Sequence, residues 1–190
     1  MHDLDLWDRA VATVAAEYAA LPAALRKKVG ETAGAIRLAK QGLHRLALER
    51  QGGDICAACG GECCRVGKYH VTVVDVLVYF AADIPLFTPR FDDDACPYLG
   101  DAGCMMGPPF RPFNCVTFNC ERVEDLWEPE RVDEFYRREQ ELRTLYGEME
   151  TIFGGRFMHG LLVNFERDVV ERGEHMLAYS KRWFDGNDDK

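Results

Sequence analysis

Four of the chain's eight cysteines fall within nine residues, in the sequence CAACGGECC from Cys56 to Cys64. A pair separated by two residues, such as Cys56 and Cys59, directs both sulfurs toward one ion, because the intervening residues form a turn. The two glycines that follow let the backbone adopt positive φ. Adjacent side chains diverge, so we expect Cys63 and Cys64 to serve different halves of a metal assembly or one multi-metal cluster.

The other four cysteines lie downstream, in and just after a stretch crowded with glycine and proline from Pro85 to Pro112. Residues of these two types interrupt helices and central strands, so we expect little regular structure there. A stretch of this kind needs something to order it, and metal binding can do so. The predicted metal ligands are Cys56, Cys59, Cys63, Cys64, Cys96, Cys104, Cys115 and Cys120.

Eight thiolates suffice for two sites of four cysteines each, because zinc binds four thiolates and iron–sulfur clusters are also held by cysteine. His70 is the best non-cysteine candidate, since it follows Cys64 by six residues. Two alternatives stay open. Structural disulfides are disfavoured because we see no secretory signal and cytosolic thiols stay reduced. A buried free thiol suits one or two positions, such as Cys120.

The motifs CAACGGECCR, VTVVDVLVYF, CPYLGDAGCMMG and RPFNCVTFNC, in this order, resemble the YkgJ-type cysteine-cluster family. The resemblance covers residues 54–122 and implies a zinc- or iron-chelating domain, with an iron–sulfur cluster as one form of the cofactor. Two features depart from the family pattern. One more residue separates Cys59 from Cys63 than in the usual CxxCxxCC. In the family, an arginine often follows the cysteine after the Arg-Pro element, and here Val116 stands at that position. These departures imply a ligand geometry that differs in detail.

The chain has 190 residues, 47% of them hydrophobic, and a formal net charge of −9. This is enough apolar material for one packed domain. The acidic balance disfavours nucleic acid and anionic membranes, because both require a basic patch. No apolar run approaches the roughly 20 residues that span a bilayer, and the first residues lack the basic and apolar regions of a signal peptide. We therefore expect a cytoplasmic protein that binds neither nucleic acid nor membrane, with an unknown protein partner left open.

Helical periodicity flanks the cysteine-rich segment on both sides. An acidic start at Asp3 or Asp5 predicts a first helix, and Pro22 fits the first turn of a second one. The second helix carries a heptad seam, so we expect the two helices to form a hairpin. The seam positions are Leu25, Val29, Thr32, Ile36, Ala39, Leu43 and Leu46. His44 lies beside the seam and is expected to be an interfacial histidine rather than a ligand.

Further helices are predicted from Asp75 to Ala82, from Pro129 to Gly154, and from about Met158 to Trp183. A short strand is predicted over Tyr69–Val74, which is rich in β-branched residues. The predicted fold is mainly α, with helical flanks around an irregular cysteine-rich metal-binding centre and at most a small strand pair. Its parts are a helical hairpin at 1–53, the metal-binding region at 54–122 and C-terminal helices at 123–190, in one compact unit.

The function that these residues favour is metal binding, with zinc or an iron–sulfur centre, in a structural, metal-handling or electron-transfer role. Two alternatives stay open. Flagellin lysine methylases carry a similar cysteine cluster, so the resemblance implies a metal-dependent methyltransferase as one alternative; the other is a helical adaptor with a structural metal core. No catalytic residue is identified, and Glu62 is expected to be solvated rather than a general base. Arg111 is predicted to lie beside the thiolates, where its guanidinium would offset their negative charge.

Overall fold

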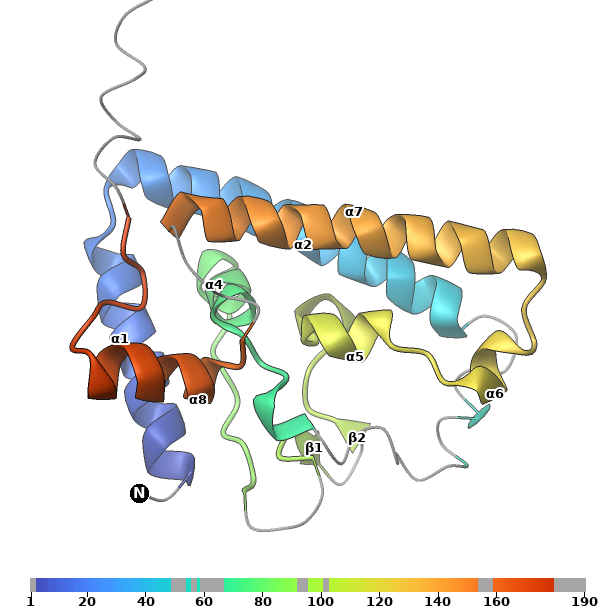
Figure 1. Cartoon of the computed structure of the whole chain (residues 1–190), viewed down its shortest axis with the longest axis horizontal. Helices are drawn as coiled ribbons and strands as arrows, with labels where there is room; N and C mark the ends of the chain where they lie inside the picture. The colour runs from blue at the N-terminus through green and yellow to red at the C-terminus, as the bar shows by residue number, and fades with distance from the viewer. Residues whose placement is uncertain are drawn as a thin grey trace, which may run out of the picture.

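The computed structural model describes residues 3–48, 54–55, 58, 67–91, 96–100, 103–153 and 159–179. It confirms the predicted mainly α fold with one small antiparallel strand pair (Figure 1). In chain order the elements are α1 (Asp3–Ala20), α2 (Ala23–Leu48), α4 (Val73–Ala81), β1 (Leu99–Gly100), β2 (Gly103–Cys104), the 3-10 helix η2 (Pro108–Phe110), α5 (Phe113–Thr117), α6 (Glu121–Glu124), α7 (Pro129–Phe153), α8 (Leu161–Asn164) and the π-helix η3 (Phe165–Glu171).

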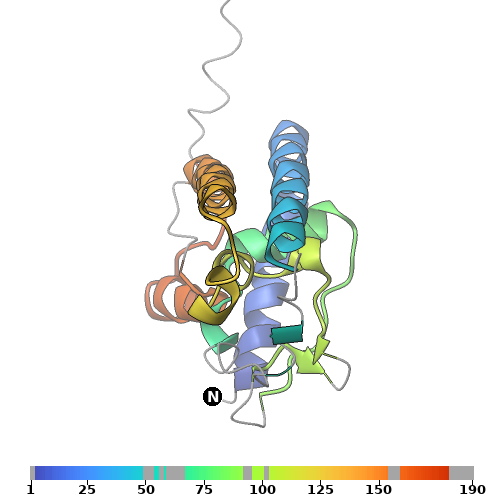
Figure 2. The same cartoon turned by 90° about the vertical axis from the view of Figure 1, so that its right-hand side faces the viewer.

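The two long helices α2 and α7 lie side by side, although they come from distant parts of the chain (Figures 1 and 2). The seam predicted for α2 is buried against α7 and α4, with Val29, Ile36 and Leu43 fully enclosed. Leu142 and Met149 of α7 are fully enclosed as well. Burying such a side chain stabilises a fold by about 1.5–3 kcal/mol, so this contact is a major part of the core.

Helix α1 packs mainly on α4 and α8 rather than on α2. The hairpin of the first two helices is therefore not the principal contact of either helix. Trp7 of α1 is buried and reaches across to Phe87 and Tyr98, with ring centroids 5.8 Å away in both cases. These rings anchor the segment that leads into β1 to the first helix.

Helix α4 lies beneath α2 and α7, and every residue from Val73 to Tyr79 is buried. The helix begins with a capping box: the Thr72 side chain accepts the Asp75 N–H, and the Asp75 carboxylate accepts the Thr72 N–H. It ends where Asp83 adopts a φ of 54°, which turns the chain away. The helix predicted from Asp75 to Ala82 is thus confirmed within two residues at each end.

Two local predictions are wrong. Tyr69–Val74 is not a strand, because the capping box starts α4 at Val73 and, in the described part of the chain, a single bridge pairs Thr72 with Gly160. The last helix stops at Glu171 instead of continuing toward Trp183, because Gly173 takes a φ of 66° and ends it. Residues 180–183 lie outside the described part of the chain.

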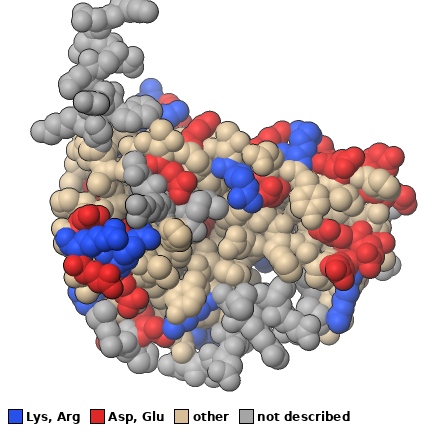
Figure 3. Space-filling model, viewed as in Figure 1, with Lys and Arg blue, Asp and Glu red and all other residues tan. Residues whose placement is uncertain are grey.

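The surface agrees with the acidic composition. On the face in Figure 3, basic side chains are flanked by acidic ones, and acidic side chains gather over the end of the molecule where α7 begins. Glutamate and arginine pairs such as Arg137 with Glu141 run along α7. None of the described helices is both long and apolar enough to cross a bilayer.

Candidate metal centre

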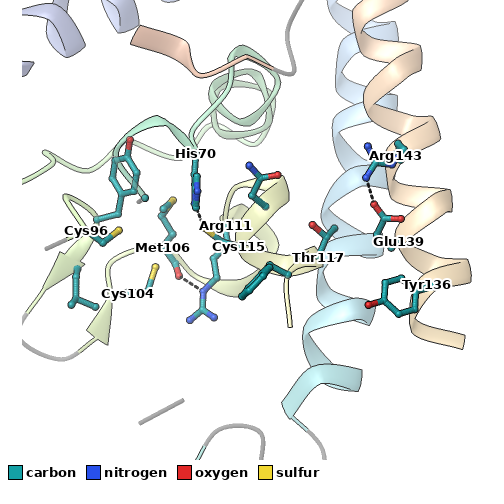
Figure 4. A pocket seen from close by; sticks show the side chains of 15 residues that line it. His70, Cys96, Cys104, Met106, Arg111, Cys115, Thr117, Tyr136, Glu139 and Arg143 are labelled. Atoms are coloured by element: carbon teal, nitrogen blue, oxygen red, sulfur yellow. Dashed lines mark hydrogen bonds and ion pairs between the residues drawn. The ribbon is translucent and has the colours of Figure 1, made fainter. Parts of the chain in front are cut away.

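A pocket of about 600 Å³ lies among the β1–β2 pair, α5 and α7 (Figure 4). Three of the predicted ligands line one side of it: Cys96, Cys104 and Cys115. His70 lies on the same side, and its ring points down between the strand pair and α5. The pocket is therefore lined by four candidate donor side chains that are dispersed along the sequence.

Short structural elements hold each of these cysteines. Cys96 begins the turn that leads into β1, where its carbonyl accepts the Leu99 N–H at 3.0 Å. Cys104 lies in β2, directly opposite Leu99. Cys115 sits in α5, a helix that Pro112 begins and whose first turn closes when the Cys115 N–H donates to the Pro112 carbonyl. Proline and glycine thus create the turns that bring the cysteines to one face.

His70 and Cys115 lie within hydrogen-bond distance, with 3.4 Å between the His70 Nδ1 and the Cys115 Sγ. Burial lowers the pKa of His70, while the negative charge of Asp75 acts in the opposite direction. Because metals bind the neutral imidazole, burial prepares His70 for coordination. The sequence identified His70 as a candidate only, and the structure brings it to the cysteines.

Gly67 makes room for Cys96. A Cβ atom placed on Gly67 would lie 2.5 Å from the Cys96 Sγ, which is closer than real atoms approach. Any larger residue at position 67 would therefore force the Cys96 side chain to move. Ile55, directly before that group, packs against the hydrophobic core.

Tyr98 forms the inner wall behind the thiols. It is 1% exposed, and its hydroxyl donates to the Lys68 carbonyl at 2.9 Å. The pKa of Tyr98 is raised well above its ordinary value, first by burial and then by the negative charges of Cys96, Cys115 and Asp75. The phenol therefore stays protonated and remains a donor that ties Lys68 to the wall.

Arg111 lies in the pocket near Cys104 and Cys115 (Figure 4). Its Nε donates to the Met106 carbonyl at 3.3 Å. The pKa of His44 on α2 is lowered, mainly by burial and also by the positive charge of Arg111. Arg111 is thus placed where a guanidinium would offset thiolate charge, as the sequence predicts, and that role remains a prediction.

The far wall of the pocket belongs to α7, which contributes Tyr136, Glu139 and Arg143 (Figure 4). Arg143 pairs with Glu139 and also lies over the Phe113 ring, 5.0 Å from its centroid. Their spacing of three and four residues places them on one helix face, a signal visible in the sequence. Sequence reasoning missed them because nothing local indicates which helix faces the cysteines.

Some of the predicted ligands do not join this group. Cys120 is half-buried at the start of α6 and does not line the pocket. The described part of the chain contains no group of three His, Cys, Asp or Glu side chains that could by itself hold a metal ion. Cys56, Cys59, Cys63 and Cys64, together with Glu62, lie outside the described residues, and so does the predicted division of Cys63 and Cys64 between two halves.

Comparison with known proteins adds no relative. No protein-family model matches the chain, and no curated protein or solved structure does either. The likeness to the YkgJ-type family therefore stays a resemblance of motifs. The function has to be argued from the pocket itself.

Proposed function

We propose that this protein binds zinc or iron through its cysteines, with Cys96, Cys104, Cys115 and His70 forming the pocket side of the centre. The observation that carries the proposal is the convergence of these four side chains, from separate elements, on one pocket. Thiolate and imidazole donors suit zinc, iron and iron–sulfur clusters, so the donor chemistry fits the proposed metal.

The remaining ligands would come from the first cysteine group. Gly67, the first of the described residues that line the pocket, follows Cys64 by three positions. Three residues of extended chain span about 11 Å at most, so chain length allows the first group to supply ligands to the pocket. No three His, Cys, Asp or Glu side chains of the described residues form a group that could hold a metal ion, so the proposed centre requires ligands from the first cysteine group.

The kind of metal decides the role. A closed zinc site of thiolates would order the cysteine-bearing segment, and an iron–sulfur centre would carry electrons. The decisive experiment is metal analysis with a visible spectrum on protein purified without oxygen. A brown protein with broad visible absorption indicates an iron–sulfur centre, and a colourless zinc-loaded protein favours a structural role.

Single serine variants test the ligand set. Cys115→Ser removes the thiol that faces His70, so we expect this variant to lose bound metal while far-UV circular dichroism keeps its helical signal. Cys120→Ser is the matched control, because Cys120 lies apart from the pocket. Full metal retention by the Cys115→Ser protein would overturn the proposal for this side of the centre.

One observation favours the enzymatic alternative. A volume of about 600 Å³ falls within the range of small-molecule pockets, about 300–1,000 Å³, and the α7 wall offers a carboxylate, a guanidinium and a phenol. A metal-dependent methyltransferase would use this space for its substrates. Titration of the metal-loaded protein with S-adenosylmethionine tests this alternative, with Glu139→Gln as a variant that alters the pocket and leaves every cysteine in place. Absence of binding would remove the support for methyl transfer.

A further inference from the structure

Four polar side chains form a buried cluster at the junction of α2, α4 and α7: Lys40, Thr72, Asp75 and Tyr146. The side chains of Lys40 and Asp75 are 0% and 1% exposed, and Lys40 Nζ lies 2.7 Å from Asp75 Oδ1. The Tyr146 hydroxyl donates to the same oxygen at 2.6 Å. The other oxygen, Oδ2, accepts the Thr72 N–H at 2.9 Å and the Thr72 hydroxyl at 2.8 Å.

Asp75 therefore accepts four hydrogen bonds, two at each oxygen. A buried ion pair gains little over apolar residues of the same shape, because both charges must leave water. Lys40 moreover interrupts an apolar face, since Ile36 and Leu43 on either side of it are fully buried. Packing alone would favour an apolar residue at position 40, so the cluster points to a task other than stability.

Asp75 holds the segment that leads into the pocket, and this contact indicates the role of the cluster. Thr72 closes the stretch from Gly67 that carries His70 into the pocket. The same stretch is held at two further points. The Leu161 N–H donates to the Val71 carbonyl at 2.7 Å, and the Tyr98 hydroxyl donates to the Lys68 carbonyl. His70 thus lies inside a segment whose backbone is fixed before and after it.

We propose that Asp75, with Lys40 and Tyr146, is a positioning group that holds the Gly67–Thr72 segment so that His70 faces Cys115. The metal-binding part of this inference rests on the proposed function, whereas the placement of His70 does not. Lys40 belongs to α2 and Tyr146 to α7, so the cluster also links the pairing of the two long helices to the orientation of one donor in the pocket.

The test compares two tyrosine-to-phenylalanine variants of the full chain. Tyr146→Phe removes one hydrogen bond to Asp75 and keeps the ring that packs on Phe113. Tyr79→Phe is the matched control. Tyr79 is also buried, with 5% of its surface exposed, and among the described residues it makes no hydrogen bond to Asp75. Asp75→Asn is a stronger variant that removes the charge and keeps the shape.

Two readouts separate positioning from simple stabilisation. The first is the ring-nitrogen NMR signals of His70 in the metal-free protein, assigned with a His70→Gln variant. The second is the affinity for Co²⁺, followed through its thiolate charge-transfer absorption. We expect Tyr146→Phe to shift the His70 signals and to weaken Co²⁺ binding about tenfold, as loss of a supporting residue around a metal ligand does. Tyr79→Phe should change neither readout, and Asp75→Asn should exceed the effect of Tyr146→Phe.

Unchanged His70 signals in folded Tyr146→Phe protein would overturn the inference, even if that variant unfolds more easily. If the unmodified protein binds no Co²⁺, the metal proposal fails separately, because the NMR readout on metal-free protein still decides whether the cluster positions His70. If Asp75→Asn does not fold, the comparison of Tyr146→Phe with Tyr79→Phe still decides it.

Discussion

The helical layer of α2, α4 and α7 and the cysteine-bearing part around β1, β2 and α5 are built on different physical terms. The layer is held together by side chains such as Ile36, Leu77 and Leu142, each of which is fully buried. The cysteine-bearing part has two-residue strands and short helices, and it exposes Cys104, Cys115 and, to 60%, Phe118. The layer is held by apolar packing throughout, whereas the cysteine-bearing part combines a few buried side chains, such as Tyr98 and Phe113, with exposed thiols.

This contrast divides the molecule into a layer held by apolar packing and a part that exposes thiols. If the proposed metal is bound, its binding free energy would add to the few buried side chains that hold the cysteine-bearing part. The helical layer does not require that contribution, because its apolar seams are complete. Variants in the two regions should therefore separate into those that change stability and those that change metal binding.

The largest effect is expected inside the layer. Lys40→Met leaves the Asp75 carboxylate buried without its cation, so we expect the free energy of unfolding to fall by about 3–5 kcal/mol. Urea unfolding followed by circular dichroism measures the change. Lys27→Met on the same helix is the control: Lys27 is 81% exposed and pairs weakly with Glu31, so the change should stay within about 0.5 kcal/mol. Equal stability of the two variants would contradict the description of this layer.

The second comparison uses two glycines. Gly67→Ala would place a methyl group 2.5 Å from the Cys96 Sγ, so we expect it to displace this thiol and weaken metal binding about tenfold. Gly147→Ala in α7 meets no atom within 4 Å and should instead raise the stability by about 0.5–1 kcal/mol. Metal titration and urea unfolding of both variants check the pair. A Gly67→Ala protein that binds metal normally would show that the position of Cys96 does not matter.

A smaller effect is expected at Arg111. Arg111→Ala removes a positive charge from beside the thiolates, so metal affinity should fall several-fold while the helical layer keeps its stability. The variant should also raise the pKa of His44, because the Arg111 charge contributes to lowering it. Arg122→Ala, at an exposed position on α6, serves as the control. Unchanged metal affinity in the Arg111→Ala protein would end the charge-compensation hypothesis.

The smallest effect concerns pH. Burial lowers the pKa of His44 in the folded protein, so the unfolded chain takes up a proton first as the pH falls. The contribution of His44 to stability is therefore complete above about pH 6.5 and is lost as the pH drops from there through the lowered pKa. His44→Gln should flatten this part of the stability profile of the metal-free protein. The pKa of His70 is lowered as well, so some pH dependence of stability should remain in the variant. A steeper stability profile in the His44→Gln protein would contradict the role given to His44.

The sequence was a good guide to the helical layer, because helical periodicity is a local property. The seam of α2 and the start of α7 were predicted from apolar spacing and a proline, whereas the start of α4 was placed at Asp75, two residues after its observed start at Val73. The partner of the seam could not be predicted, since pairing with α7 rather than α1 depends on the whole chain. The burial of Lys40 was not predicted either, although it lies four residues after Ile36 and three before Leu43.

The candidate site was predictable in its chemistry but not in its arrangement. The cysteines and His70 were identified as donors from residue type and spacing alone. Their grouping around one pocket, with Cys120 apart from it, depends on the turn before β1 and on the placement of α5. The pocket wall made by Tyr136, Glu139 and Arg143 could not be predicted, because it depends on the pairing of α2 with α7, which no local sequence pattern encodes.

The pairing of α2 with α7 also sets an order of events during synthesis. A ribosome makes all eight cysteines before it makes α7, since the last of them is Cys120 and α7 begins at Pro129. At about 5–20 residues per second, completing the chain from Cys120 to Phe153 takes about 2–7 seconds. During that interval the thiols exist without the helix that later walls their pocket. A metal ion supplied then would meet the thiols before α7 packs on α2 and forms one wall of their pocket.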